Sequence, residues 1–194
     1  MMKKKFFLLY TILFAIVFPA LSQKKKIQFQ STNTFELISG QSPLSTGFQS
    51  VNGFKFSSWF AGAGIGVDNY NYKTLPLFFD ARKFFGSEKR AFFYGDIGYD
   101  FPMKDKPGKE ISYYSSYYYS SFHFTGGIYT DIGIGYQFPL CKKTNLAFSL
   151  GYSYKKLESK IGVGSFCPNM LCAINYYNYE FSYGRMILKA GLVF

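Results

Sequence analysis

A set of acidic and basic side chains lies on the polar side of segments that alternate between apolar and polar residues. Carboxylates held close together could act as an acid–base pair, and mixed charges could line a path for protons or ions. The alternative is a set of salt bridges, because buried charges must pair to offset the cost of removing them from water. The candidates are Glu36, Asp68, Asp80, Arg82, Asp96, Asp100, Asp131, Arg185 and Lys189. We favour the salt-bridged arrangement.

The single histidine, His123, stands among hydroxyl side chains, with Ser120 and Ser121 before it and Thr125 after it. A histidine base beside a hydroxyl is the usual way to activate a nucleophile. No acidic partner and no oxyanion donor can be named from the sequence. A loop histidine without a catalytic role is therefore the preferred interpretation.

Two of the three cysteines, Cys167 and Cys172, flank a short segment that we interpret as a loop. In an exported protein they could form a disulfide, and two free thiols are the alternative. Cys141 stands alone beside Lys142 and Lys143. With no histidine or further cysteine near any of them, no metal site and no cofactor is predicted.

The segment 103–125 is rich in tyrosine and serine. Such residues form adaptable recognition surfaces, and the alternative is that the flanking strands extend and their rings pack together. The aromatic candidates for a surface loop are Tyr113, Tyr114, Tyr117, Tyr118, Tyr119 and Phe122.

Residues 1–22 have the organisation of a secretory signal peptide. Lys3, Lys4 and Lys5 precede an apolar run over 6–18, and Ala20 and Ser22 supply the small residues of a cleavage site. An apolar run of about 13 residues is shorter than the roughly 20 that a membrane-spanning helix needs. Cleavage before Gln23 is expected, and it leaves one domain over 23–194.

Aromatic residues make up 22% of the chain, with 24 Phe and 18 Tyr, and 19 glycines accompany them. This composition favours strands over helices. No later segment is apolar for about 18 residues, so the domain is either secreted and soluble or a closed membrane barrel. A soluble β-sandwich would carry polar residues on its outer faces, whereas these strands have Phe, Ile, Leu and Tyr there.

Period-two alternation predicts eight strands. In 145–154, Leu146, Phe148 and Leu150 share one face, and in 185–194 Leu188 and Leu192 do the same. The expected strands are 27–38, 46–56, 59–70, 75–85, 91–101, 127–138, 145–154 and 185–194. Connections are short near 56–58, 85–90 and 139–144, and longer or more variable near 40–45, 71–74, 103–125 and 158–182. Short turns at one end and longer loops at the other are typical of outer-membrane barrels.

The export signal, the alternating strands, the fragments Ile97-Gly98-Tyr99 and Ile134-Gly135-Tyr136, and the final Phe194 together resemble small outer-membrane β-barrel proteins of Gram-negative bacteria. The family's C-terminal assembly signal is similar to Leu192-Val193-Phe194, although Gly191 lies nearer the end than is usual. The resemblance implies an all-β, eight-stranded, antiparallel, up-and-down transmembrane β-barrel. It also implies a monomer in the outer membrane with both termini in the periplasm, inserted by the assembly machinery and surrounded by lipid and lipopolysaccharide.

Eight strands enclose a lumen that side chains can fill. We therefore expect a non-enzymatic barrel with a salt-bridged lumen, whose surface loops serve interaction with an extracellular ligand or membrane integrity. Glycines at 62, 64, 66, 133 and 135 are expected to make room for long Arg and Lys side chains. The alternatives are a lipid A-modifying hydrolase that depends on His123, and a narrow solute pore. The net charge of +11 does not indicate nucleic acid, because an exported barrel does not meet it; rim lysines would face lipopolysaccharide phosphates.

Overall fold

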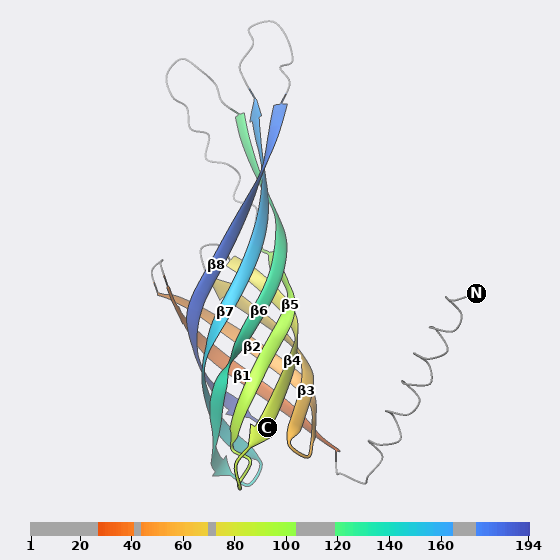
Figure 1. The fold of residues 1–194 in the computed structure, drawn as a ribbon, viewed down its shortest axis with the longest axis vertical. Coiled ribbons are helices and arrows are strands. Elements are labelled where there is room, and N and C mark those ends of the chain that lie inside the picture. The colour runs from red at the N-terminus through yellow and green to blue at the C-terminus, as the bar shows by residue number, and fades with distance from the viewer. Residues whose placement is uncertain (1–26, 41–43, 70–72, 104–118, 165–173) are drawn as a thin grey trace, which may run out of the picture.

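The computed structural model describes residues 27–40, 44–69, 73–103, 119–164 and 174–194. The predicted signal peptide, 1–22, lies outside these residues. Eight strands form one closed barrel in sequence order, and each neighbouring pair is antiparallel (Figure 1). The strands are β1 (Ile27–Ser39), β2 (Ser45–Phe56), β3 (Trp59–Asn69), β4 (Lys73–Phe85), β5 (Ala91–Pro102), β6 (Tyr119–Cys141), β7 (Thr144–Gly164) and β8 (Ile174–Val193). Within the described ranges, no helix is long and apolar enough to cross a membrane.

Burial alternates along the strands as the sequence predicts. In β5, Phe93 and Ile97 are exposed on the outside of the barrel, whereas Tyr94 and Asp96 are buried inside. In β8, Leu188 faces outward and Lys189 inward. This period of two follows from the pleat of a strand, and it gives the barrel an apolar outer surface and a mixed interior.

The two ends of the barrel differ in their connections. Tight turns join β2 to β3, β4 to β5 and β6 to β7 at one end, which we call the turn end. Three residues in these turns, Ser57, Gly86 and Lys89, have positive φ angles of 60°, 82° and 50°, the left-handed conformation that close reversals of the chain require. The first residues of β1 and the last residues of β8 lie at this end (Figure 1). The other end, with the longer connections, is the loop end.

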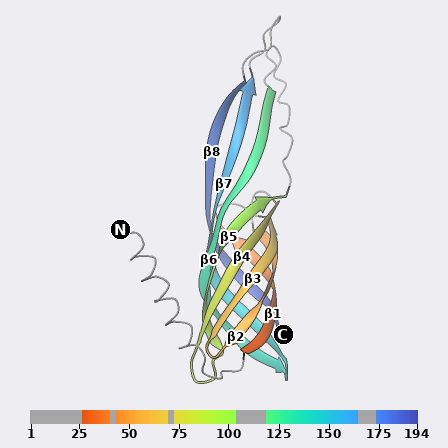
Figure 2. The same ribbon diagram turned by 90° about the vertical axis from the view of Figure 1, so that its right-hand side faces the viewer.

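At the loop end, β6, β7 and β8 continue well beyond the other strands. β5 pairs with β6 only up to Gly127, and β1 pairs with β8 only up to Met186. Beyond these residues β6, β7 and β8 pair with one another alone, and Figure 2 shows them standing above the barrel as a narrow sheet. We call this sheet the extension.

The predicted bounds of these three strands, 127–138, 145–154 and 185–194, are therefore too short. Tyr119 and Phe122, for which a surface loop and an extended strand were the alternatives, lie in β6, and so does His123, which was expected in a loop. A sheet with water on both faces has no apolar side, so consecutive residues such as those at 176–180 are all exposed and do not alternate in the way the barrel strands do. Hydropathy alone could not detect this part of the strands.

Candidate functional site

The lumen contains every acidic and basic side chain in our predicted set, and each of them is buried. They separate into clusters that follow one another along the barrel axis, with aromatic rings between them. The aromatic cluster contains Val51, Phe60, Phe78, Phe84, Phe92, Tyr94 and Tyr129.

The cluster nearest the turn end is the pair of Arg82 and Asp80 on β4. The guanidinium Nη2 lies 2.7 Å from Asp80 Oδ2, and Nε donates to both carboxylate oxygens at 2.9 and 3.0 Å. Alternate residues of a strand share a face, which is why two residues of one strand can pair inside the barrel. The Phe60 and Phe92 ring centroids lie 5.0 and 5.6 Å from the guanidinium carbon. Cation–π contact therefore adds to the charge pairing.

The central cluster is organised around Lys189 of β8. Its Nζ lies 2.7 Å from Asp131 Oδ2 on β6, 3.3 Å from Asp96 Oδ2 on β5 and 3.3 Å from Glu36 Oε1 on β1. It also donates to Gln49 Oε1 on β2 at 3.0 Å. One ammonium group thus joins side chains from strands on different sides of the barrel.

Neutral side chains fix the position of Asp131 in this cluster. The Tyr94 hydroxyl donates to Oδ1 at 3.0 Å, and the Tyr129 hydroxyl donates to Oδ2 at 3.4 Å. Gln49 Nε2 in turn donates to the Tyr129 oxygen at 2.8 Å. Gln49 therefore bridges Tyr129 and Lys189, so the central cluster is one hydrogen-bonded network.

A third cluster, nearer the loop end, surrounds Lys155 of β7. Its Nζ forms ion pairs with Asp68 of β3 and, at 2.8 Å, with Asp100 of β5. Thr74 accepts from Lys155 at 3.2 Å and donates to Asp68 Oδ1 at 2.6 Å. Lys155 was absent from the predicted set because the predicted strand ended at residue 154. Ser149, Gly151 and Ser153 face inward, and every second residue of a strand shares a face. Extending the predicted strand by one residue would therefore have identified Lys155 as an inward residue.

The lumen at the loop end contains Arg185 of β8, whose Nη1 donates to Ser45 Oγ at 3.2 Å. Ile38 and Ile187 pack together there, with Tyr183 against them. Gly40 leaves room for Arg185, since a Cβ at Gly40 would lie 2.8 Å from Arg185 Cγ.

The prediction that glycines 62, 64, 66, 133 and 135 make room for Arg and Lys side chains is wrong. A Cβ at Gly64 would overlap the Phe78 ring, one at Gly135 the Phe92 ring, and one at Gly133 would come 2.6 Å from Tyr94 Cε1. The nearest atoms at Gly62 and Gly66 also belong to other residue types, including Gln49. These glycines instead allow aromatic rings and neighbouring backbone to pack across a narrow barrel.

Acids outnumber bases among the buried residues. The carboxylates are Glu36, Asp68, Asp80, Asp96, Asp100 and Asp131, and the bases are Arg82, Lys155, Arg185 and Lys189. Glu36 Oε1, Asp96 Oδ1 and Asp100 Oδ1 have no aligned hydrogen-bond donor. Glu36 Oε1 lies within ion-pair distance of Lys189 Nζ, but the angle between the two groups is not that of a hydrogen bond. No group of His, Cys, Asp and Glu in the described ranges is suited to hold a metal ion.

The remaining predicted candidates lie on or near the extension. The backbone of His123 pairs with that of Lys160, and Thr125, the candidate nucleophile, donates its hydroxyl to the Glu158 carbonyl at 3.2 Å. Tyr113, Tyr114, Tyr117 and Tyr118 lie outside the described residues, as do Cys167 and Cys172, so their disulfide stays a prediction. Cys141 is an exposed free cysteine.

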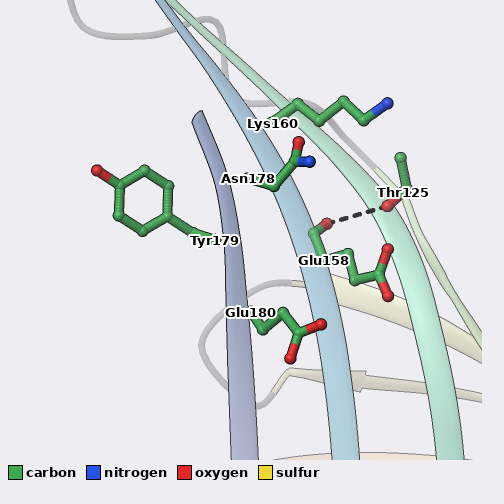
Figure 3. Close-up of a pocket in the computed structure, with 6 residues that line it drawn as sticks. All are labelled: Thr125, Glu158, Lys160, Asn178, Tyr179 and Glu180. Carbon is green, nitrogen blue, oxygen red and sulfur yellow. Dashed lines mark hydrogen bonds between the residues drawn. The ribbon is translucent and has the colours of Figure 1, made fainter. Parts of the chain in front are cut away.

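The extension carries a small cavity of about 120 Å³. Figure 3 shows its lining side chains, which come from all three strands of the extension, together with the bond from Thr125 to Glu158. Lys160 and Asn178 add donors, and Glu158 and Glu180 add carboxylates. Tyr176, Tyr177 and Tyr179 are exposed nearby on β8. This surface is polar and aromatic, unlike the outer face of the barrel below it.

Comparison with known proteins locates the fold. No family model and no curated protein matches the sequence. The solid-state NMR structure of the outer membrane protein AlkL in DMPC lipid bilayers is similar, with a TM-score of 0.51 and 11% identity over 89% of this chain and 92% of AlkL. The crystal structure of the outer membrane protein OprG from Pseudomonas aeruginosa gives a TM-score of 0.47 and 11% identity over 89% of this chain and 97% of OprG. With its closed eight-stranded barrel and apolar outer face, the chain is a small β-barrel of the outer-membrane type.

Proposed function

We propose that this protein is a non-enzymatic outer-membrane barrel that does not conduct, and whose extension forms an interaction surface outside the membrane. The observation that carries the proposal is the Lys189 cluster. One buried ammonium group contacts carboxylates of β1, β5 and β6, so side chains from several strands meet across the lumen.

The packing of the lumen supports closure. An eight-stranded barrel encloses a space that side chains are able to fill. Here the Arg82 pair lies against Phe60 and Phe92, and the Lys155 cluster follows above the Lys189 cluster. A continuous column of water would have to pass each of these clusters in turn. Separating buried ion pairs to admit it would be costly.

The proposed placement in the membrane follows the connections. In outer-membrane barrels the short turns face the periplasm and the longer loops face the exterior. The turn end, with both termini, is then periplasmic, and the extension stands outside among lipopolysaccharide.

Planar bilayer recording of the purified protein tests closure. Three proteins are compared: the unaltered chain, Lys189→Ala/Asp131→Ala in the lumen, and the matched ion-pair control Lys156→Ala/Glu180→Ala on the extension. We expect no steady single-channel current from the unaltered chain or the control at neutral pH. Reproducible current in both, altered only by the lumen substitutions, would refute the plug and establish a pore.

A narrow cation pore is the second candidate function, and one observation favours it. The lumen has more carboxylates than bases, and oxygens of Asp96 and Asp100 lack aligned donors. Such a lumen would attract cations. A current that reverses at the cation equilibrium potential under a salt gradient would therefore favour this function over the plug.

The catalytic alternative has less support. The hydroxyl proton of Thr125 is directed to the Glu158 carbonyl, whereas a nucleophile gives its proton to its base. We expect that His123→Ala leaves the lipid A of producing cells unchanged in mass. A mass difference between cells producing the unaltered protein and cells producing His123→Ala would establish the hydrolase.

A further inference from the structure

A cavity of about 420 Å³ opens at the turn end, where the first and last strands close the barrel. β8 pairs with β1 only from Thr32 onward, and Ser31 exchanges backbone hydrogen bonds with Phe194. The first residues of β1 therefore extend past the end of β8, and the β6–β7 turn lies across the space that remains. The lining residues are Gln28, Phe29, Gln30, Lys55, Lys142, Lys143, Asn145, Val193 and Phe194.

The polar lining of this cavity is suited to an anion. Lys55, Lys142 and Lys143 bring three positive charges to it. Gln30 is 6% exposed, and its amide nitrogen has no hydrogen-bond partner. An unmatched buried donor is costly unless a ligand or water accepts from it. A phosphate oxygen would satisfy the amide and pair with the lysines.

The apolar lining indicates that the anion belongs to an amphiphile. Phe29 and Phe194 are 63% and 53% exposed, and Phe29 packs edge-on against the outward Phe54 at a centroid distance of 5.8 Å. These rings lie where the lipid-facing surface ends at the turn end. A molecule with acyl chains on the rings would bring its headgroup to the lysines without leaving the membrane.

We propose that this cavity binds the phosphate of an anionic phospholipid in the leaflet at the turn end. Its acyl chains lie against Phe29 and Phe194, and its phosphate accepts from Lys142, Lys143 and the Gln30 amide. The surrounding rim favours the same lipid class, because Lys83 near the end of β4 and Lys89 and Arg90 in the β4–β5 turn lie at the same end, with Glu88 paired to Arg90. The barrel fold is sufficient for this proposal, and neither lumen closure nor membrane orientation enters it.

Native mass spectrometry of the mature protein in detergent tests the proposal by counting bound lipids. The probes are dioleoylphosphatidylglycerol and its zwitterionic counterpart, dioleoylphosphatidylcholine. We expect one phosphatidylglycerol to bind about tenfold more tightly than phosphatidylcholine. Lys142→Gln/Lys143→Gln should weaken it by about tenfold, and Gln30→Met should weaken it further.

Two controls make the result specific. Lys83→Gln/Lys89→Gln removes the same charge from the same end but outside the cavity, and it should leave the affinity unchanged. An equal loss of affinity in this variant would show diffuse attraction to a basic rim and would overturn the proposed site.

Glycerol phosphate at the same concentration as the lipid should not compete with it. Full competition would assign the cavity to a soluble anion and would overturn the proposal of a lipid ligand. Equal binding of the two lipids would also overturn the proposal.

Discussion

Replacing Lys189 by methionine should be among the most destabilising single substitutions in this barrel. The methionine side chain is flexible and of similar length, so it occupies most of the same space. Asp131, Asp96 and Glu36 would then lose the ammonium group that lies 2.7, 3.3 and 3.3 Å from them. Removing one partner of a buried ion pair costs about 3 to 5 kcal/mol. Three carboxylates share this cation, so the upper part of that range is expected.

The matched control is Lys156→Met on the extension. Lys156 Nζ lies 2.9 Å from Glu180 Oε2, a distance like that of the Lys189 pairs, but the two side chains are 35% and 62% exposed. Exposed pairs contribute little to stability, because water screens their attraction. The two substitutions remove the same group from similar distances, so their difference measures the effect of burial.

The assay is urea unfolding in lipid vesicles, followed by the fluorescence of Trp59, the single tryptophan of the sequence. Trp59 is 47% exposed on the outside of the barrel at the turn end, so unfolding moves it from lipid to water and shifts its emission to the red. A Lys189→Met barrel within about 1 kcal/mol of the unaltered protein would refute the reasoning. If Lys189→Met does not fold, Lys189→Met/Asp131→Asn/Asp96→Asn should recover folding, because it removes two of the three uncompensated charges and leaves only that of Glu36.

Two further substitutions test the faces and the packing of the strands. Leu188→Arg places a charge on the lipid-facing side of β8 and should cost about 2 to 4 kcal/mol near the membrane centre, whereas Ser182→Arg on the extension should cost almost nothing in the same unfolding assay. Gly64→Ala should cost about 1 to 3 kcal/mol, because its Cβ would overlap the Phe78 ring and lie 3.0 Å from Val51 Cγ2. Gly95→Ala should be nearly neutral, since its nearest neighbour would be Ile132 Cγ2 at 3.9 Å, and equal effects at the two glycines would contradict the packing described.

The barrel strands could be predicted because each one has lipid on one side and the lumen on the other. That difference in surroundings produces the alternation of apolar and polar residues in 145–154. The alternation in turn predicts which residues of β7 face outward and which face the lumen. Lys155 still faces the lumen, but the outward residues that follow Tyr154, namely Lys156 and Glu158, are charged and no longer apolar. The strand continues there without a hydropathy signal, and so Lys155 and the continuation of β7 and β8 were not predicted, whereas the continuation of β6 was one of the two alternatives for 103–125.

The grouping of the lumen charges could not be predicted either. The alternation of inward and outward residues places Lys189 and Asp131 inside the barrel, but it does not give their relative heights along the barrel axis. Those heights depend on the stagger between strands, which the hydrogen-bond register of all eight strands determines together. The stagger between strands also decides which glycine lies opposite which aromatic ring, as Gly133 lies opposite Tyr94.

The distribution of charge among the strands has a consequence for how the barrel forms. The carboxylates of the central cluster lie on β1, β5 and β6, and their shared cation lies on β8, the last strand of the chain. A sheet that lacks β8 would hold these acids facing one another without a counter-charge. Docking of β8 joins the first strand to the last and brings the shared cation to these acids at the same time, so intermediates that lack β8 lack the stabilisation of the central cluster. We therefore expect closure of the barrel to be cooperative, because the last strand of the chain carries the cation that the central carboxylates share.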